Sequence, residues 1–168
     1  RKLQYYLESS GNHPLTQTVH IDEFEIGTPK KGQQGRSKSD EKVRVVIATE
    51  IRNGKVGNAY ARVIDDFSSN SLKEIFDKHI SFEAEIKADG WRGYSPLKRL
   101  YKRLTQEKSE NGNNFPEIHI QIRNFKNWLR GVHSYCEVQN MQDYINEYFY
   151  RFNRRNNRQT IMDKIFDR

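Results

Sequence analysis

The sequence predicts an α/β domain built on a mixed five-stranded sheet with flanking helices. Two observations predict this class. The first part of the chain alternates apolar and polar residues with the period of strands, and later segments switch to helical spacing. A length of 168 residues fits one domain that encloses its own core. Hydrophobic residues make up 35% and gather in Val-, Ile- and Phe-rich runs, so the chain is predicted to fold.

Three strands in the first part of the chain are expected to form an antiparallel meander. The alternation or continuity of apolar residues places them at 19–26, 43–51 and 55–64. Asn53-Gly54 stands between the second and third, and this dipeptide is the strongest short hairpin signal. Residues 28–42 form a loop by their composition.

Helices and two further strands are expected to follow. Residues 68–79 have helical spacing with serines at the start as N-caps. We expect a strand at 82–88, a second helix at 95–107 and a last short strand at 118–122. The remainder is helical, and the apolar stripe of residues 137–152 favours core packing over a cofactor site.

This order of elements predicts a specific topology. Parallel neighbours need a crossover connection, usually helical and right-handed, and the chain supplies one before each of the last two strands. With the first strand central, the sheet is ribonuclease-H-like. Asp22 in the first strand and Asp89 at the end of the fourth then converge, although 67 residues separate them. Gly90 and Gly93 would allow a close approach of backbone there.

Two converging carboxylates repel each other unless a cation lies between them. Hard divalent ions such as Mg²⁺ prefer oxygen ligands, and two such ions about 4 Å apart activate a nucleophile on a phosphodiester. Asp22 shares its strand face with Phe24 and Ile26, where an unpaired carboxylate is costly. The alternative is structural: Asp22 as a cap or ion-pair partner, and Asp89 as a turn residue.

Charge and cysteine content narrow the class of partner. The net charge is +7 and the pI is near 9.5, which favours a polyanionic partner such as nucleic acid over a merely basic surface. Cys136 is the only cysteine, which excludes an intrachain disulfide and a cysteine-based zinc site. The sequence shows neither an apolar run of membrane-spanning length nor a signal peptide.

Four pieces of the chain occur together in one order. They are HIDEFEIG with a following GRSK, then ADGWRGY, then HIQIRNFKNWLRGVH, and finally YINEYFYRFNRR, and they span roughly residues 19 to 155. In this the chain resembles the catalytic domain of bacterial insertion-sequence transposases of the DDE superfamily. The resemblance is closest to the ISXO-like branch, whose three site residues are aspartate, aspartate and asparagine.

The resemblance implies site residues. Asp22 matches the first catalytic and metal-binding aspartate, Asp89 the second, and Asn124, 35 residues after Asp89, the third position. Related members place a glutamate two residues after the asparagine, where this chain has Lys126. His119 would also be able to reach the site, although a structural role is the alternative for such a histidine.

Cationic and aromatic residues would contact the nucleic acid. Trp91 and Trp128 offer rings for base stacking, with core packing as the alternative. A solvated basic face is the alternative for the cations. The expected phosphate contacts are Arg92, Lys126, Arg130, Arg154 and Arg155.

The resemblance also implies an activity and partners. The enzyme would be a polynucleotidyl transferase that uses two Mg²⁺ or Mn²⁺ ions, cuts double-stranded DNA at element ends to expose a 3′ hydroxyl, and joins it to target DNA. We expect a homo-oligomer assembled on DNA in the bacterial cytoplasm, at the nucleoid when active. The alternatives are a catalytically decayed DNA-binding module and a ribonuclease-H-like nuclease acting on hybrids or junctions.

The expected domain organisation has three parts. Residues 1–18 form an N-terminal extension, 19–155 the catalytic domain and 156–168 a basic C-terminal tail. Because full-length members of the branch carry an N-terminal zinc ribbon whose cysteines are missing here, we expect recognition of element ends to lie in a preceding segment.

Overall fold

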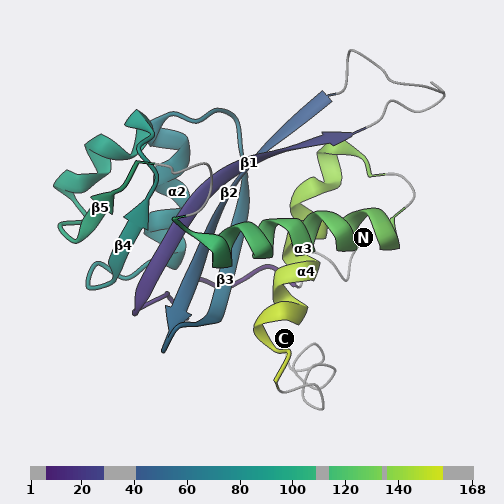
Figure 1. Cartoon of the computed structure of the whole chain (residues 1–168). Helices are drawn as coiled ribbons and strands as arrows, with labels where there is room; N and C mark the ends of the chain where they lie inside the picture. Colours follow the sequence, from purple (N-terminus) through teal and green to yellow (C-terminus); the bar gives the residue numbers. More distant parts are fainter. Residues whose placement is uncertain (1–6, 29–40, 109–113, 134–135, 157–168) are drawn as a thin grey trace.

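A mixed sheet forms the centre of the computed structural model, which describes residues 7–28, 41–108, 114–133 and 136–156 (Figure 1). The strand order is β3-β2-β1-β4-β5, with β1 at the centre. β1 pairs antiparallel with β2 and parallel with β4, and β5 is parallel to β4. The strands are β1 (Thr18–Thr28), β2 (Glu41–Arg52), β3 (Lys55–Ile64), β4 (Glu85–Ala88) and β5 (Leu104–Gln106).

Helices cover both faces of this sheet. Figure 1 shows α3 and α4 on one face and α2 on the other. Among the described residues, none of the helices combines the length and apolar character needed to cross a membrane. The helical elements are α2 (Ser69–His79), the 3₁₀ helix η1 (Arg92–Arg99), α3 (Pro116–Val132), the 3₁₀ turn η2 (Val138–Asn140) and α4 (Met141–Asn153).

Period-2 alternation along β1 divides the core into two layers. Val19 and Ile21 face α2 and η1, whereas Phe24 and Ile26 face α3 and α4. The layer on the α2 side includes Val46, Ala48, Leu72, Ile75, Phe76, Ile86, Ala88, Tyr94 and Leu97. The layer on the α3 side includes Val45, Ile47, Ile118, Ile122, Phe125, Leu129, Met141, Ile145 and Phe149.

The ribonuclease-H-like arrangement predicted from the sequence is confirmed. The hairpin between β2 and β3 turns at Asn53 and Gly54, whose φ angles are 51° and 70°. Two consecutive positive φ angles are those of a type I′ turn, which accounts for this residue pair. α2 begins after Ser68, whose hydroxyl accepts the N–H of Ser71 as an N-cap. The predicted loop at 28–42 lies, apart from its end residues, outside the described residues.

The helix predicted at 95–107 is wrong. The chain instead forms η1 over Arg92–Arg99 and then the strand β5, which begins at Leu104. Pro96 lacks the N–H that a longer α-helix would need, and the buried Tyr94 and Leu97 are three residues apart, as one 3₁₀ turn requires. The three residues of β5 form a strand because they pair with β4. This pairing in the folded domain, and not a local sequence pattern, determines the secondary structure of the segment.

The strand predicted at 118–122 is also wrong, because these residues belong to α3. Pro116 occupies the first turn, where its missing N–H is harmless, and the helix runs through Gly131 to Val132. Ile118 and Ile122 face the core as an i, i+4 pair, whereas Ile120 is 46% exposed. Over five residues, isoleucines at alternate positions fit a strand and a helix equally. The helical spacing continues to Phe125 and Leu129, which accounts for the helix.

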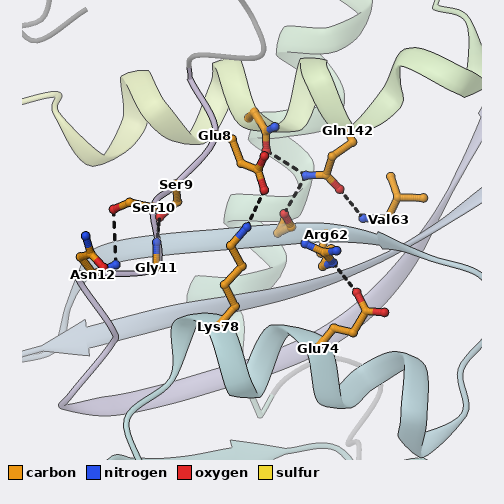
Figure 2. A network of polar contacts seen from close by, with 12 residues as sticks. Glu8, Ser9, Ser10, Gly11, Asn12, Arg62, Val63, Glu74, Lys78 and Gln142 are labelled. Carbon is orange, nitrogen blue, oxygen red and sulfur yellow. Dashed lines mark hydrogen bonds and ion pairs between the residues drawn. The ribbon is translucent and has the colours of Figure 1, made fainter. Parts of the chain in front are cut away.

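Side chains of the C-terminal helix cover the outer edge of β3. Asn153 accepts the backbone N–H of Ala59 at 2.8 Å and donates to the Ala59 carbonyl at 2.9 Å. Gln142 accepts the N–H of Val63 at 2.8 Å, a contact visible in Figure 2. Arg155 donates to the carbonyls of Val56 and Gly57. These groups act as a partial substitute for a sixth strand on an otherwise unpaired edge.

The segment before β1 packs against the end of α2. Leu15 is buried, and its N–H donates to the carbonyl of His79 while its own carbonyl accepts the N–H of Ser81. Figure 2 shows Glu8 paired with Lys78 beside the Arg62–Glu74 ion pair. Residues 7–17 of the predicted N-terminal extension therefore contact the sheet domain.

Replacing Asn153 tests the cover on β3. Asn153→Ala removes both hydrogen bonds to Ala59, so the N–H and the carbonyl of Ala59 lose their side-chain partner. The free energy of unfolding, measured in urea, should fall by about 1–3 kcal/mol. Asn153→Asp keeps the acceptor and loses the donor, so its loss should be smaller. The control is Asn127→Ala on the exposed side of α3. Equal stability of the Asn153→Ala and control proteins would show that the edge contacts add nothing.

Candidate active site

The sheet brings Asp22 and Asp89 together. Ile21 of β1 is paired in parallel with Ala88 of β4, so the two aspartates occupy the next positions of the same register. Neighbouring strands lie about 4.8 Å apart, which places both residues at adjacent backbone positions. Alternation directs the Asp22 side chain to the α3 side of the sheet, the side of Phe24, and the charge of Asp89 acts on Asp22. The parallel pairing of the first and fourth strands expected from topology is confirmed.

The Asp22 carboxyl is largely removed from water. Its side chain is 15% exposed, and Oδ1 accepts the backbone N–H of Glu23 at 2.9 Å. Burial raises the pKa of Asp22 to about 6, and the Asp89 carboxylate adds to this rise. Without a cation, Asp22 is therefore an easily protonated acid at the edge of the core.

Asp89 has a structural role as well. Its Oδ1 accepts the N–H of Trp91 at 2.9 Å, so the turn interpretation of this residue is also correct. The indole of Trp91 donates to the carbonyl of Phe67, and a Cβ on Gly93 would lie 2.6 Å from that same oxygen. Gly93 is therefore required by packing, whereas a Cβ on Gly90 would make only ordinary contacts at 3.9 Å.

α3 contributes His119 and Lys126 to the same region. His119 Nδ1 lies 3.5 Å from Asp22 Oδ2. Lys126 Nζ lies 5.1 Å from the centre of the Phe24 ring. Burial lowers the pKa of Lys126, and the charges of both residues lower the pKa of Asp22 as lesser causes. Sequence reasoning correctly expected His119 to reach the site, although it assigned the residue to a strand.

Asn124 does not lie with the two aspartates. It is exposed on α3, five residues after His119. At 100° per residue, its side chain leaves the helix about 140° around from His119, away from Asp22. Among the described residues, no hydrogen bond or ion pair joins Asn124 to Asp22 or to Asp89. Its role as the third site residue remains a prediction from the resemblance.

Glu23 is a further acidic residue that sequence reasoning did not assign to the site. It points to the opposite face of β1 from Asp22 and accepts a hydrogen bond from the hydroxyl of Tyr94, which is fully buried. Burial raises the pKa of Glu23 to about 7, and the carboxylates of Asp89 and Asp22 add to the rise. Its position on the same face as the buried Val19 and Ile21 was the available sequence signal.

Asp22 and Asp89 are the residues that can hold a divalent cation. Their carboxylate oxygens are donors that Mg²⁺ and Mn²⁺ accept, and a cation would offset the desolvation and repulsion recorded at Asp22. The donor chemistry therefore fits such a metal. In the described part of the chain, however, no group of three or more His, Cys, Asp or Glu side chains is arranged to hold an ion.

Comparison with known proteins identifies the family of this chain. Residues 14–153 match the ISXO2-like transposase domain. The chain belongs to this family. The searches of curated proteins and of solved structures gave no match. The family match confirms the resemblance to insertion-sequence transposases, and it covers both aspartates and Asn124.

The cations predicted to contact DNA lie in different environments within the transposase domain. Arg92 and Arg130 are exposed, and the Arg92 guanidinium lies 5.7 Å from the Trp91 ring. Arg154 stacks over Tyr150 at 3.7 Å. Arg155 donates to three backbone carbonyls, so its guanidinium is already engaged in holding α4 against β3.

Trp91 and Trp128 also lie in different environments. Trp128 packs against Phe125 and Tyr148 in the layer under α3, as the core-packing alternative expected. Trp91 is 39% exposed beside Asp89, with its indole N–H bonded to Phe67. The face of the Trp91 ring is therefore the more accessible of the two.

The raised pKa of Asp22 predicts a pH-dependent effect of Asp22→Asn in the metal-free protein. The folded pKa of about 6 exceeds the ordinary 3.8, so the folded state binds more protons between these values. Stability of the wild type is lost as pH rises through this window. Asp22→Asn should therefore raise the free energy of unfolding by up to about 3 kcal/mol at pH 8 and change it little at pH 4.

Urea unfolding at several pH values measures this difference. Asp65→Asn, which removes an exposed carboxylate, is the matched control and should show no comparable gain. A difference between Asp22→Asn and wild type that stays constant from pH 4 to pH 8 would contradict the assignment.

Proposed function

We propose that this transposase domain is a catalytic core that cleaves DNA strands at the ends of an insertion sequence and joins them to target DNA. The observation that carries the proposal is the parallel register of β1 and β4, which ends at Ile21 and Ala88, the residues just before Asp22 and Asp89. A pair of neighbouring carboxylates suits divalent cations that act on phosphodiesters. Family membership supports the proposal because the match covers both strands.

The chain's own residues would bind and orient the reacting groups. Asp22 and Asp89 would hold Mg²⁺ or Mn²⁺, and Asn124 is the third residue that the resemblance implies. Such ions supply activation of a water or 3′ hydroxyl and stabilisation of the leaving oxygen. Cation binding would keep the buried Asp22 ionised, because an adjacent positive charge favours the charged form. Lys126, beside Asp22, would offset phosphate charge.

The DNA-binding surface would extend from the aspartates over cations of α3 and of η1. Lys126 and Arg130 lie one helical turn apart on α3, and Arg92 begins η1 just after Asp89. Double-stranded DNA would be the partner, and a homo-oligomer would assemble on it. Such a protein would act in the bacterial cytoplasm, where its DNA lies.

A second candidate function is DNA binding without catalysis. The position of Asn124 favours it, since this side chain lies on the far flank of α3 and brings no charge to the aspartates. A domain that has lost its third metal-binding group would still bind DNA through its cations. Metal binding and strand cleavage, measured on the same preparation, separate the two functions.

A metal titration tests the two aspartates. A ligand that binds only the folded state stabilises it, by about 2.7 kcal/mol at a concentration 100 times Kd. Mn²⁺ should therefore raise the melting temperature of the wild type, and Asp22→Asn should weaken this response. The double variant Asp22→Asn, Asp89→Asn should abolish it, while Asp65→Asn should respond as wild type does. An intact response in the double variant would place the metal elsewhere.

A salt titration tests the cations near the site. Duplex affinity should fall with rising salt, and the slope of log affinity against log salt scales as about −0.9 for each phosphate contacted. Neutralising Arg92, Lys126 and Arg130 to glutamine should reduce the magnitude of that slope by about 2 to 3.

The matched control changes the same number of charges farther along the same part of the chain. Lys98 and Arg99 end η1 and Lys102 lies between η1 and β5, whereas Asp89 follows the end of β4. Their glutamine variants should leave most of the slope intact. Equal flattening by both triple variants would mean that DNA contacts the domain without preference for the site face.

A further inference from the structure

A polar cavity lies along β3, across the central strands from Asp89. It has a volume of about 230 Å³ and is formed by the segment before β1, by β3, by the end of α2 and by α4. Figure 2 shows Glu8, Arg62 and Gln142, which come from three of these elements and line the cavity. Because β2 and β1 separate β3 from β4 in the sheet, this cavity is distinct from the candidate active site.

The size of the cavity limits what it can hold. One water molecule occupies about 30 Å³ of the liquid, whereas sites for drug-sized ligands span about 300–1,000 Å³. A volume of about 230 Å³ therefore suits a compact polar group together with a part of the molecule that carries it.

The side-chain amides of α4 present donors to this cavity. Gln142 Oε1 accepts the backbone N–H of Val63, so its Nε2 is the atom that donates to Asn146 Oδ1 at 2.9 Å. The Val63 N–H can only donate, which fixes the orientation of both amides. In the described part of the chain, the amide nitrogen of Asn146 makes no hydrogen bond. Asn146 therefore has two N–H groups available for a ligand.

Arg154 brings a positive charge to the same cavity. Its guanidinium carbon lies 3.7 Å from the centre of the Tyr150 ring, and Nη1 donates to the Tyr150 carbonyl at 3.3 Å, so the planar group is held in place. No carboxylate of the described residues lies within ion-pair distance of Arg154. Its remaining N–H groups form the rigid fork that matches phosphate oxygens.

The other charges that line the cavity are matched in pairs. Glu8 forms an ion pair with Lys78, and Arg62 forms one with Glu74. The charge of Arg154 is therefore the one that a ligand is needed to offset. An acceptor-rich anion fits these groups better than a cation or a ligand with many donors.

His79 is a further polar group of the cavity wall. Its ring stacks on Tyr60 with centres 4.2 Å apart and is 6% exposed. Burial lowers the pKa of His79 to about 4, so the imidazole is neutral at pH 7. Among the described residues, its buried Nδ1 has no hydrogen-bond partner. Buried polar atoms are nearly always hydrogen-bonded, so this exception beside the cavity favours a site that a ligand or water completes.

We propose that this cavity binds the phosphate group of a nucleotide, with the guanidinium of Arg154 and the amide N–H groups of Asn146 as donors. A phosphate dianion offers only acceptor oxygens, and its bonds to arginine are charge-assisted. The choice of a nucleotide as the carrier rests on the proposed function, which supplies DNA. The phosphate site itself requires neither Asp22 nor Asp89, and no cation.

Calorimetric titration of the chain with deoxyadenosine 5′-monophosphate (dAMP), in metal-free buffer, tests the site. The wild type should bind dAMP, and deoxyadenosine, which lacks the phosphate, should bind at least about tenfold more weakly. Asn146→Asp keeps the acceptor for Gln142 and replaces two N–H donors with a negative charge, so dAMP affinity should fall by roughly tenfold to a hundredfold. Arg154→Gln should cause a loss of the same order.

Two controls separate this site from general charge effects and from the aspartates. Arg151→Gln removes a cation of the same helix whose side chain is 65% exposed and paired with Glu147, and this variant should bind dAMP as wild type does. The double variant Asp22→Asn, Asp89→Asn should also bind dAMP normally. Loss of the Mn²⁺ response with dAMP binding retained would therefore remove the cation site alone.

Competition identifies the source of the phosphate. Displacement of dAMP by a short 5′-phosphorylated DNA strand, and not by the same strand with a 5′ hydroxyl, would support the site and assign it to a DNA end. Displacement by both strands would support internal DNA phosphates, and displacement by neither would support a free nucleotide. No binding of dAMP by the wild type, or equal dAMP affinity in wild type, Asn146→Asp and Arg154→Gln, would overturn the phosphate site.

Discussion

The short parallel ladder between β1 and β4 is the interaction on which the site depends. Four residue pairs make it, from Thr18 with Glu85 to Ile21 with Ala88. Its register is fixed on the α2 side, where Ile21 and Ala88 are fully buried. A slip by one residue would turn Asp89 toward that core and a hydrophobic side chain toward α3. Packing on one face of the sheet thus decides which groups meet on the other.

Acidic side chains gather where this ladder ends. Asp22 faces α3 and Glu23 faces η1, and the pKa of each carboxyl is raised mainly by burial, with a contribution from Asp89. On the η1 side the hydroxyl of Tyr94 satisfies Glu23, whereas on the α3 side His119 and Lys126 only approach Asp22. The α3 side is therefore the incompletely compensated one. Such a cost in stability is common where a protein must bind a charged ligand.

Much of this architecture could be predicted from the sequence, and the exceptions have physical reasons. β1, β2, β3 and α2 follow from local periodicity, because each is long enough to display its period. β5 has three residues and exists only through its pairing with Ile86 and its neighbours, which no local pattern encodes. The segment from Ile118 to Ile122 fits both periods, so its helical state required the context of Pro116 and Phe125.

In the candidate site too, some residues could be predicted from the sequence and others could not. Asp22 and Asp89 were predictable because topology alone pairs the first part of β1 with β4. The position of His119 relative to Asn124 depends on the helical phase of α3, and a strand assignment for residues 118–122 concealed that phase. Glu23 was not assigned because its significance lies in a hydrogen bond from Tyr94, 71 residues away in sequence.

The cover on β3 limits how copies of this domain can associate. Backbone groups of Ala59 and Val63, on the edge that faces away from β2, already bond to side chains of α4. The opposite edge of the sheet, β5, offers only three residues. Continuous sheets shared between two molecules are therefore disfavoured at either end. In the proposed assembly on DNA, copies would meet through side-chain surfaces or through the DNA itself, and such an assembly would be reversed without unpairing any strand.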